Sequence, residues 1–163
     1  KLNKTKIAMI CGPLTSKAFN ERLSSFKKYM GTYGLPTYPE YFAYAESFGF
    51  TSGYNAATSL LNKVIERPEV LLVASDDLAL GVLKALRDRG IRVPEDIQVI
   101  GFDDIAYAKH FTPALTTIVQ DRKLLGETAA RELISMIESP HAKFAEVLRL
   151  PVELVEREST KVS

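Results

Sequence analysis

The sequence predicts an α/β fold in which helices flank a mostly parallel sheet. Predicted strands and helices alternate along nearly all of the 163 residues, which is the pattern of parallel sheets. Residues 70–74 form a continuous apolar run, typical of a strand buried on both sheet faces. Two acidic pairs, Asp76-Asp77 and Asp103-Asp104, directly follow predicted strands. Because small ligands bind beyond the carboxyl ends of parallel strands, both pairs should face one crevice in a Rossmann-like sheet.

Six strands are expected from apolar runs that are bounded by turn residues. The first ends at the Gly12-Pro13 turn, and the last is expected as one or two strands broken near Pro151. The expected strands cover residues 6–11, 41–45, 70–74, 97–102, 115–119 and 147–155.

Four helices are expected where apolar residues recur every three or four positions. Gly34 ends the first of them, and Pro36 prevents its resumption. Pro68 closes the second, Gly90 stops the third, and a short helical piece begins at Asp104. The expected helices cover residues 16–33, 51–66, 77–89 and 122–138.

The third expected helix is apolar on nearly every side. Between Leu78 and Leu86, Lys84 is the only residue that is neither apolar nor glycine. Such a helix must be covered on more than one side. The sheet supplies one cover, and either another helix of the same chain or a symmetric partner subunit supplies the other. The second alternative motivates a homodimer hypothesis.

Composition and charge indicate an ordinary soluble protein. The 21 basic and 20 acidic residues leave a net charge of +1, so no basic surface is expected to attract nucleic acid. No apolar run approaches the roughly 18 residues of a membrane span, and no segment has the pattern of a signal peptide. The single Cys11 cannot form an internal disulfide, which favours a reducing, cytoplasmic compartment. The abrupt start at Lys1 suggests that a natural N-terminal part is missing.

The acidic pairs have three interpretations. Asp103 sits where its strand ends and is the better candidate to accept hydrogen bonds from ligand hydroxyls. Clustered carboxylates also suit a magnesium ion, which a metal-dependent enzyme would use. Alternatively, Ser75, Asp76 or Asp77 caps the helix that follows, and Asp104 caps the short helical piece after it.

Arg22 and Phe48 are further candidate ligand contacts. Arg22 lies among the apolar residues of the first helix, so its guanidinium either reaches over the strand ends to clamp a ligand or stays in solvent. Phe48 follows the second strand, where its ring either stacks on a sugar or base or packs locally. Phe50 is better suited to packing.

Motifs of common enzyme classes are missing from the sequence. There is no Gly-x-Ser-x-Gly, no P-loop and no Gly-x-Gly-x-x-Gly. Neither histidine has a cysteine or carboxylate at metal-ligand spacing, and Cys11 in an apolar strand is typical of a buried small hydrophobe. We therefore expect no catalytic residue, no metal and no cofactor.

Several longer motifs carry a family resemblance. They are Ala74-Ser75-Asp76-Asp77-Leu78-Ala79-Leu80-Gly81, Val93-Pro94-Glu95-Asp96-Ile97, Gly101-Phe102-Asp103-Asp104 and Pro113-Ala114-Leu115-Thr116-Thr117-Ile118. Shorter matches lie at Cys11-Gly12-Pro13, at Glu21-Arg22-Leu23 and over residues 151–160. Together they resemble the effector-binding core of the LacI/GalR family of bacterial transcription regulators, over nearly the whole chain.

The resemblance implies a two-lobed architecture like that of periplasmic sugar-binding proteins. A small effector, usually a sugar, a sugar phosphate or a purine, binds between the lobes and alters operator affinity through lobe closure. Residues 1–112 and 145–158 would form the C-terminal lobe. Residues 113–144 would form the crossover and a helix of a truncated N-terminal lobe, leaving the apolar face of that helix exposed.

The resemblance also implies roles for individual residues. Arg22 matches the family's effector-clamping arginine, Phe48 the aromatic that stacks on the effector, and Asp103 the acidic residue that bonds ligand hydroxyls or ring nitrogens. Ser75 stands where family members often carry Asn, which shortens its reach. Further expected effector contacts are Ser16 and Arg122, and the expected dimer-interface residues are Leu78, Val82, Leu83 and Phe111.

The sequence thus predicts the effector-sensing and dimerisation core of a LacI-type regulator, most simply a sugar-responsive repressor. Operator DNA would be bound only through the missing N-terminal helix-turn-helix. The alternative is a periplasmic-type sugar-binding protein of the same core fold, and a magnesium-dependent enzyme is the third interpretation. Because only one wall of the cleft is present, we expect this chain alone to bind effector weakly or not at all.

Overall fold

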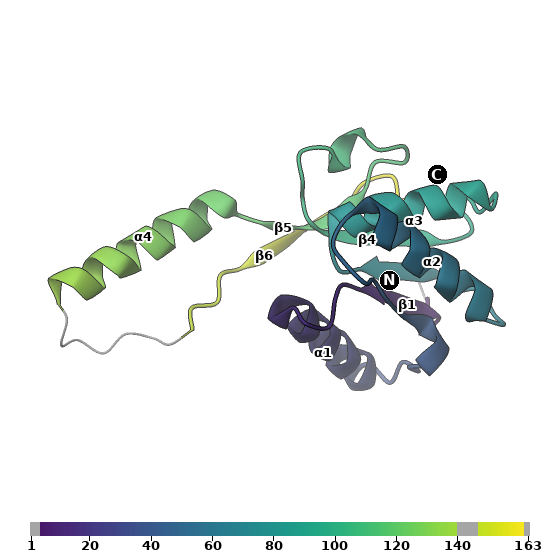
Figure 1. Ribbon diagram of the computed structural model, residues 1–163, viewed down its shortest axis with the longest axis horizontal. Helices are drawn as coiled ribbons and strands as arrows, with labels where there is room; N and C mark the ends of the chain where they lie inside the picture. The colour runs from purple at the N-terminus through teal and green to yellow at the C-terminus, as the bar shows by residue number, and fades with distance from the viewer. Residues whose placement is uncertain (1–3, 140–146, 162–163) are drawn as a thin grey trace.

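A six-stranded sheet in the order β2-β1-β3-β4-β5-β6 organises the computed structural model (Figure 1). The structure describes residues 4–139 and 147–161. The first five strands in that order run parallel, and β6 pairs antiparallel with β5. The strands are β1 (Ile7–Cys11), β2 (Phe42–Tyr44), β3 (Val70–Val73), β4 (Gln98–Asp103), β5 (Thr116–Gln120) and β6 (Val152–Val155). The expected parallel α/β fold is confirmed.

The four expected helices are all present, within a few residues of their predicted ends. Figure 1 shows α1 on one side of the sheet and α2 with α3 on the other, as right-handed crossovers require. Two short 3₁₀ turns, Pro39–Tyr41 and Ala108–His110, complete the described elements. The helices are α1 (Lys17–Thr32), α2 (Phe50–Lys63), α3 (Asp76–Asp88) and α4 (Arg122–Glu138).

The second cover of α3 is α2, a helix of the same chain. Leu78 and Val82 have no exposed surface, and a side-chain carbon added at Gly53 would overlap the carbonyl oxygen of Leu78. The two helix backbones therefore touch. The prediction that Leu78 and Val82 lie in a dimer interface is wrong, because their side chains are enclosed by their own subunit.

The other two expected interface residues lie closer to the surface. Leu83 is 9% exposed, and Phe111 is partly buried against the core. Both line a small pocket of about 270 Å³ together with Phe50 and Leu80. Leu83 and Phe111 thus remain candidates for a contact with a partner.

Two segments differ from their expected structure. Only residues 152–155 of the predicted strand 147–155 form a strand, because residues 147–151 have no partner strand and Pro151 has no backbone N–H. In addition, β5 pairs with β4, and Leu115 is fully buried. Residues 115–120 therefore belong to the main body, although the expected lobe boundary falls at residue 112. Part of the expected lobe-crossover region, residues 140–146, lies outside the described residues.

The last helix stands away from the rest of the molecule (Figure 1). No residue of α4 is buried, so its apolar face is exposed, as the resemblance implies. The exposed ones include Leu125, Leu133, Ile134, Met136 and Ile137. Among the helices that the structure describes, none combines the length and apolar character needed to cross a membrane.

Candidate functional site

Arg22 and Asp103 meet at the carboxyl edge of the sheet. Arg22 lies on α1 and reaches across the end of β3 to the end of β4. Its Nη2 lies 3.4 Å from Oδ1 of Asp103, and its Nη1 donates to the carbonyl oxygen of Ala74. The guanidinium carbon lies 3.6 Å from the centre of the Phe102 ring, so the planar cation stacks on that ring. The Arg22 side chain is 21% exposed, so it is a partly buried clamp rather than a solvated surface group.

Asp103 accepts hydrogen bonds from two further side chains. Nε2 of Gln120 donates to Oδ1 of Asp103 at 2.7 Å, and Nη2 of Arg122 donates to its backbone carbonyl at 3.4 Å. Burial raises the pKa of the Asp103 carboxyl, while the positive charge of Arg22 opposes that rise. Burial also lowers the pKa of Arg22, and the charge of Asp103 opposes that change. The two groups therefore stabilise each other's charged forms.

Phe48 joins this pair through a second aromatic residue. The Phe48 ring is 5.4 Å from the ring of Phe19, whose centre lies 5.5 Å from the Arg22 guanidinium carbon. Phe48 is 68% exposed, so one face of its ring is open to a ligand. The structure thus brings Arg22, Phe48 and Asp103 to one rim, as the sequence predicts.

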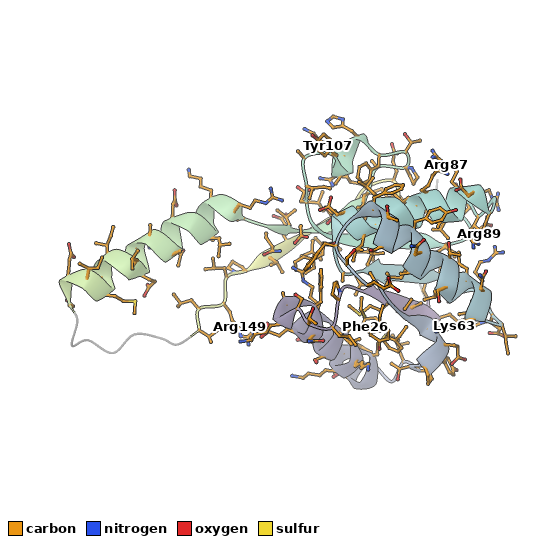
Figure 2. All side chains as sticks on the ribbon, in the orientation of Figure 1. Phe26, Lys63, Arg87, Arg89, Tyr107 and Arg149 are labelled. Atoms are coloured by element: carbon orange, nitrogen blue, oxygen red, sulfur yellow. The ribbon has the colours of Figure 1, made fainter. Side chains whose placement is uncertain are left out.

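A cavity of about 730 Å³ extends from this rim along the α1 side of the sheet. Its lining includes Arg22 and Phe102 at one end and Phe26 and Met30 of α1 further along. Figure 2 shows Arg149, on the segment before β6, beside the end of α1, where it also lines the cavity. The cavity is mainly apolar, with its charged groups at the rim.

The two candidate serines differ in position. Ser75 is 8% exposed, and its Oγ accepts from the backbone N–H of Leu78 at 3.4 Å. The interpretation of Ser75 as the cap of the following helix is confirmed, and this contact points its hydroxyl into the helix end. Ser16 directly precedes α1 without capping it through its side chain and is partly exposed. Arg122 is exposed and touches the site through the Asp103 carbonyl.

Asp76 and Asp104 of the two acidic pairs do not cap helices. Asp76 directs its carboxylate toward Thr117 and the backbone N–H of Ile105, away from its own helix end. Asp104 forms an ion pair with Arg157 at 2.8 Å, so the prediction that Asp104 caps a short helix is wrong. Within residues 4–139 and 147–161, no three His, Cys, Asp or Glu side chains gather as metal ligands would.

Sequence reasoning missed several residues of the site. Gln120 is recognised only from the sheet. Asp103 of β4 lies opposite Val119 of β5, and Gln120 is the next residue of β5. Phe102 was assigned to a strand and Phe19 to a helix face, and neither has a local signal for contact with Arg22. Their contact depends on how α1 crosses the sheet edge.

Cys11 is buried, as predicted for a small apolar residue of a strand. Burial raises the pKa of its thiol to about 11.

Comparison with known proteins identifies the family of this chain. The family model described as the periplasmic binding protein-like domain matches residues 1–160. The chain belongs to this family.

Within it, the chain corresponds to the effector-binding core of LacI-type regulators. It is 35% identical to the lactose operon repressor of Escherichia coli over 159 residues, which cover 98% of this chain and 42% of the relative. It is 37% identical over 153 residues to the transcriptional repressor PurR of Salmonella paratyphi B, covering 94% of this chain and 44% of the relative. The chain thus spans less than half the length of these relatives, which are transcriptional repressors rather than enzymes.

Solved LacI-type structures share the fold. The complex of the transcriptional regulator CelR with cellobiose has a TM-score of 0.88 at 32% identity, covering 96% of this chain and 47% of that one. The lac repressor dimer bound to operator and the anti-inducer ONPF has a TM-score of 0.87 at 34% identity, covering 98% and 54%. The resemblance to LacI-type regulators is therefore confirmed.

Proposed function

We propose that this chain is the effector-sensing core of a LacI-type repressor and that Arg22, Asp103 and Phe48 bind the effector. The observation that carries the proposal is the Arg22–Asp103 pair, which lies beside an open aromatic ring at the sheet edge. A carboxylate and a guanidinium together accept from and donate to ring hydroxyls or purine nitrogens. The exposed face of Phe48 supplies a surface for stacking on a sugar or purine ring.

The effector class follows from this chemistry and from the relatives. The charged pair suits a polar ring compound, and the cellobiose bound by CelR and the name of the lactose operon repressor favour a sugar. Sugar phosphates and purines are the other classes in our proposal. Ser16, which directly precedes α1, and Arg122, which donates to the Asp103 carbonyl, are proposed as additional contacts.

The rest of the protein is proposed from the family. We propose that residues 4–120 and 152–158 form most of one lobe and that α4 leads into a second lobe, which would cover its apolar face. We propose that the full-length protein is a cytoplasmic homodimer that uses Leu83 and Phe111 in its interface. It would bind operator DNA through a helix-turn-helix module outside this chain. The nearly balanced charge of the chain itself gives no reason for DNA binding.

A thermal-shift screen of the full-length protein tests this function. Sugars, sugar phosphates and purines are added singly, and one class is expected to raise the melting temperature. A ligand present at about 100 times its Kd stabilises the folded state by roughly 2.7 kcal/mol, which is a shift of several degrees. The 163-residue chain serves as the control, and little or no shift is expected from it because only one wall of the cleft is present. If no compound shifts the full-length protein, the assignment is wrong.

Effector affinity is expected to fall when the solution is acidified. Ionised Asp103 accepts charge-assisted hydrogen bonds with both oxygens, and burial raises its pKa above the ordinary value of 3.8. Protonation therefore removes the negative charge and converts one oxygen to a donor at a pH above that value, so affinity is highest at neutral pH and weakens as the pH falls. Calorimetric titrations between about pH 7 and pH 4 measure this. A constant affinity over that range would show that Asp103 does not bind the effector.

A further inference from the structure

Asp76 lies beneath the candidate site and is the only fully enclosed acidic side chain among the described residues. It begins α3, but its carboxylate leaves the helix. Oδ1 accepts from the hydroxyl of Thr117 at 2.7 Å, and Oδ2 accepts from the backbone N–H of Ile105 at 3.0 Å. A single buried group thus connects α3 to β5 and to the segment that follows β4.

The same carboxylate lies directly against β4. A side-chain carbon added at Gly101 would overlap Oδ1 of Asp76. The absence of a side chain at this position is therefore what allows the carboxylate to reach between β4 and β5. Burying a charge here is costly unless its hydrogen bonds are made, so Thr117 and Ile105 are needed as partners.

The segment that Asp76 holds includes Asp103, the carboxylate that we propose binds the effector. Asp103 has a φ of 112° and Asp104 a φ of 47°. Residues other than glycine seldom have such positive φ angles. Such a conformation persists when neighbouring contacts determine it. Two of the contacts to this segment come from below the rim residues: the carboxylate of Asp76 accepts from the N–H of Ile105, and Arg157 pairs with Asp104 at 2.8 Å.

We propose that Asp76 is a positioning residue for effector recognition. It holds the segment 103–105 and β5 together, so that Asp103 meets both Arg22 on α1 and Gln120 on β5. This inference rests on the proposed function, because it concerns the same site. Asp76 itself is enclosed and does not touch the effector.

The charges around Asp76 give the proposal a second measurable consequence. Desolvation raises the pKa of Asp76, the hydrogen bonds from Thr117 and Ile105 oppose that rise, and the negative charge of Asp103 adds to it. Arg22 from α1 and Arg122 from α4 are the cations that face Asp103. Since the repulsion between the two carboxylates is mutual, Asp76→Asn should lower the pKa of Asp103.

Substitutions at Thr117 test the positioning role without removing the carboxylate. In the full-length protein, Thr117→Val removes the hydroxyl and keeps the shape, whereas Thr117→Ser keeps the hydroxyl. We expect Thr117→Val to speed amide hydrogen exchange at Ile105 about tenfold. The amide of Ala74, which directly follows β3 and donates to the Ile10 carbonyl of β1 at 2.9 Å, is the reference and should be unchanged. Thr117→Ser should behave like the unmodified protein.

Two further measurements complete the test. Carboxyl-carbon NMR over a pH series gives the pKa of Asp103, which should fall in Asp76→Asn. Calorimetry with D-ribose, cellobiose and hypoxanthine gives affinity, and any of these that binds should bind about tenfold more weakly to Thr117→Val and normally to Thr117→Ser.

The outcomes separate this inference from the proposed function. If none of the three compounds binds any variant, the Ile105 exchange and the Asp103 pKa still decide the role of Asp76. Unchanged values for both in the variants would overturn the inference. Faster Ile105 exchange with unchanged affinity would also overturn it, because the segment would then be held without positioning the effector contact.

Discussion

Arg22→Ala is expected to weaken effector binding by at least about 100-fold, which corresponds to roughly 2.7 kcal/mol. The substitution removes a charge-assisted donor and leaves Asp103 partly buried without its cation. It also removes the charge that opposes the burial-driven rise in the pKa of Asp103. The loss of that charge reduces the fraction of Asp103 that is ionised and able to accept charge-assisted hydrogen bonds. Calorimetry with the compound identified by the thermal-shift screen measures the loss.

Two further variants make the Arg22 result specific. Arg22→Lys keeps the charge but loses the planar group that stacks on Phe102 and bonds the Ala74 carbonyl, so it should recover only part of the affinity. Arg67→Ala removes an exposed arginine away from the rim and should leave affinity unchanged. Normal binding by a folded Arg22→Ala protein would exclude Arg22 from the site.

Gly81→Ala is expected to destabilise the fold by about 3 kcal/mol, which lowers the melting temperature by roughly ten degrees. A side-chain carbon at this position would overlap the Phe50 carbonyl oxygen and crowd the backbone N of Tyr54. These atoms belong to the backbone of α2, so they cannot move aside as a side chain would. The helices α2 and α3 must therefore separate, which opens the core around Leu78.

A matched glycine provides the control for this packing effect. Gly31→Ala makes the same change in α1, where an added carbon meets nothing within 4 Å. Alanine favours helix over glycine by up to about 1 kcal/mol, so this variant should be unchanged or slightly more stable. Urea unfolding followed by circular dichroism compares the two. Equal stability of both variants would show that α2 and α3 are not in backbone contact.

The sequence by itself determined the succession of strands and helices along the chain and the edge of the sheet at which the site lies. Helical spacing and strand length are local properties, and a parallel sheet places the carboxyl ends of its strands at one edge. The position of Asp103 at this edge therefore needed only the strand that precedes it. Phe48 likewise follows a strand end, so its place on the rim could be predicted.

Where the sequence allowed two different contacts for a residue, only the tertiary structure decided which contact is made. The apolar pattern of α3 showed that a second cover was needed, but the same pattern fits a partner subunit or α2, and packing selected α2 around Leu78 and Val82. Arg22 could face solvent or the strand ends, and the crossing of α1 over the sheet brought it to Asp103. Asp76 and Gln120 acquire their partners from β5, which lies side by side with β4 in the sheet. A local pattern specifies which face of an element is apolar, whereas the contact that each polar group makes depends on elements distant in the sequence.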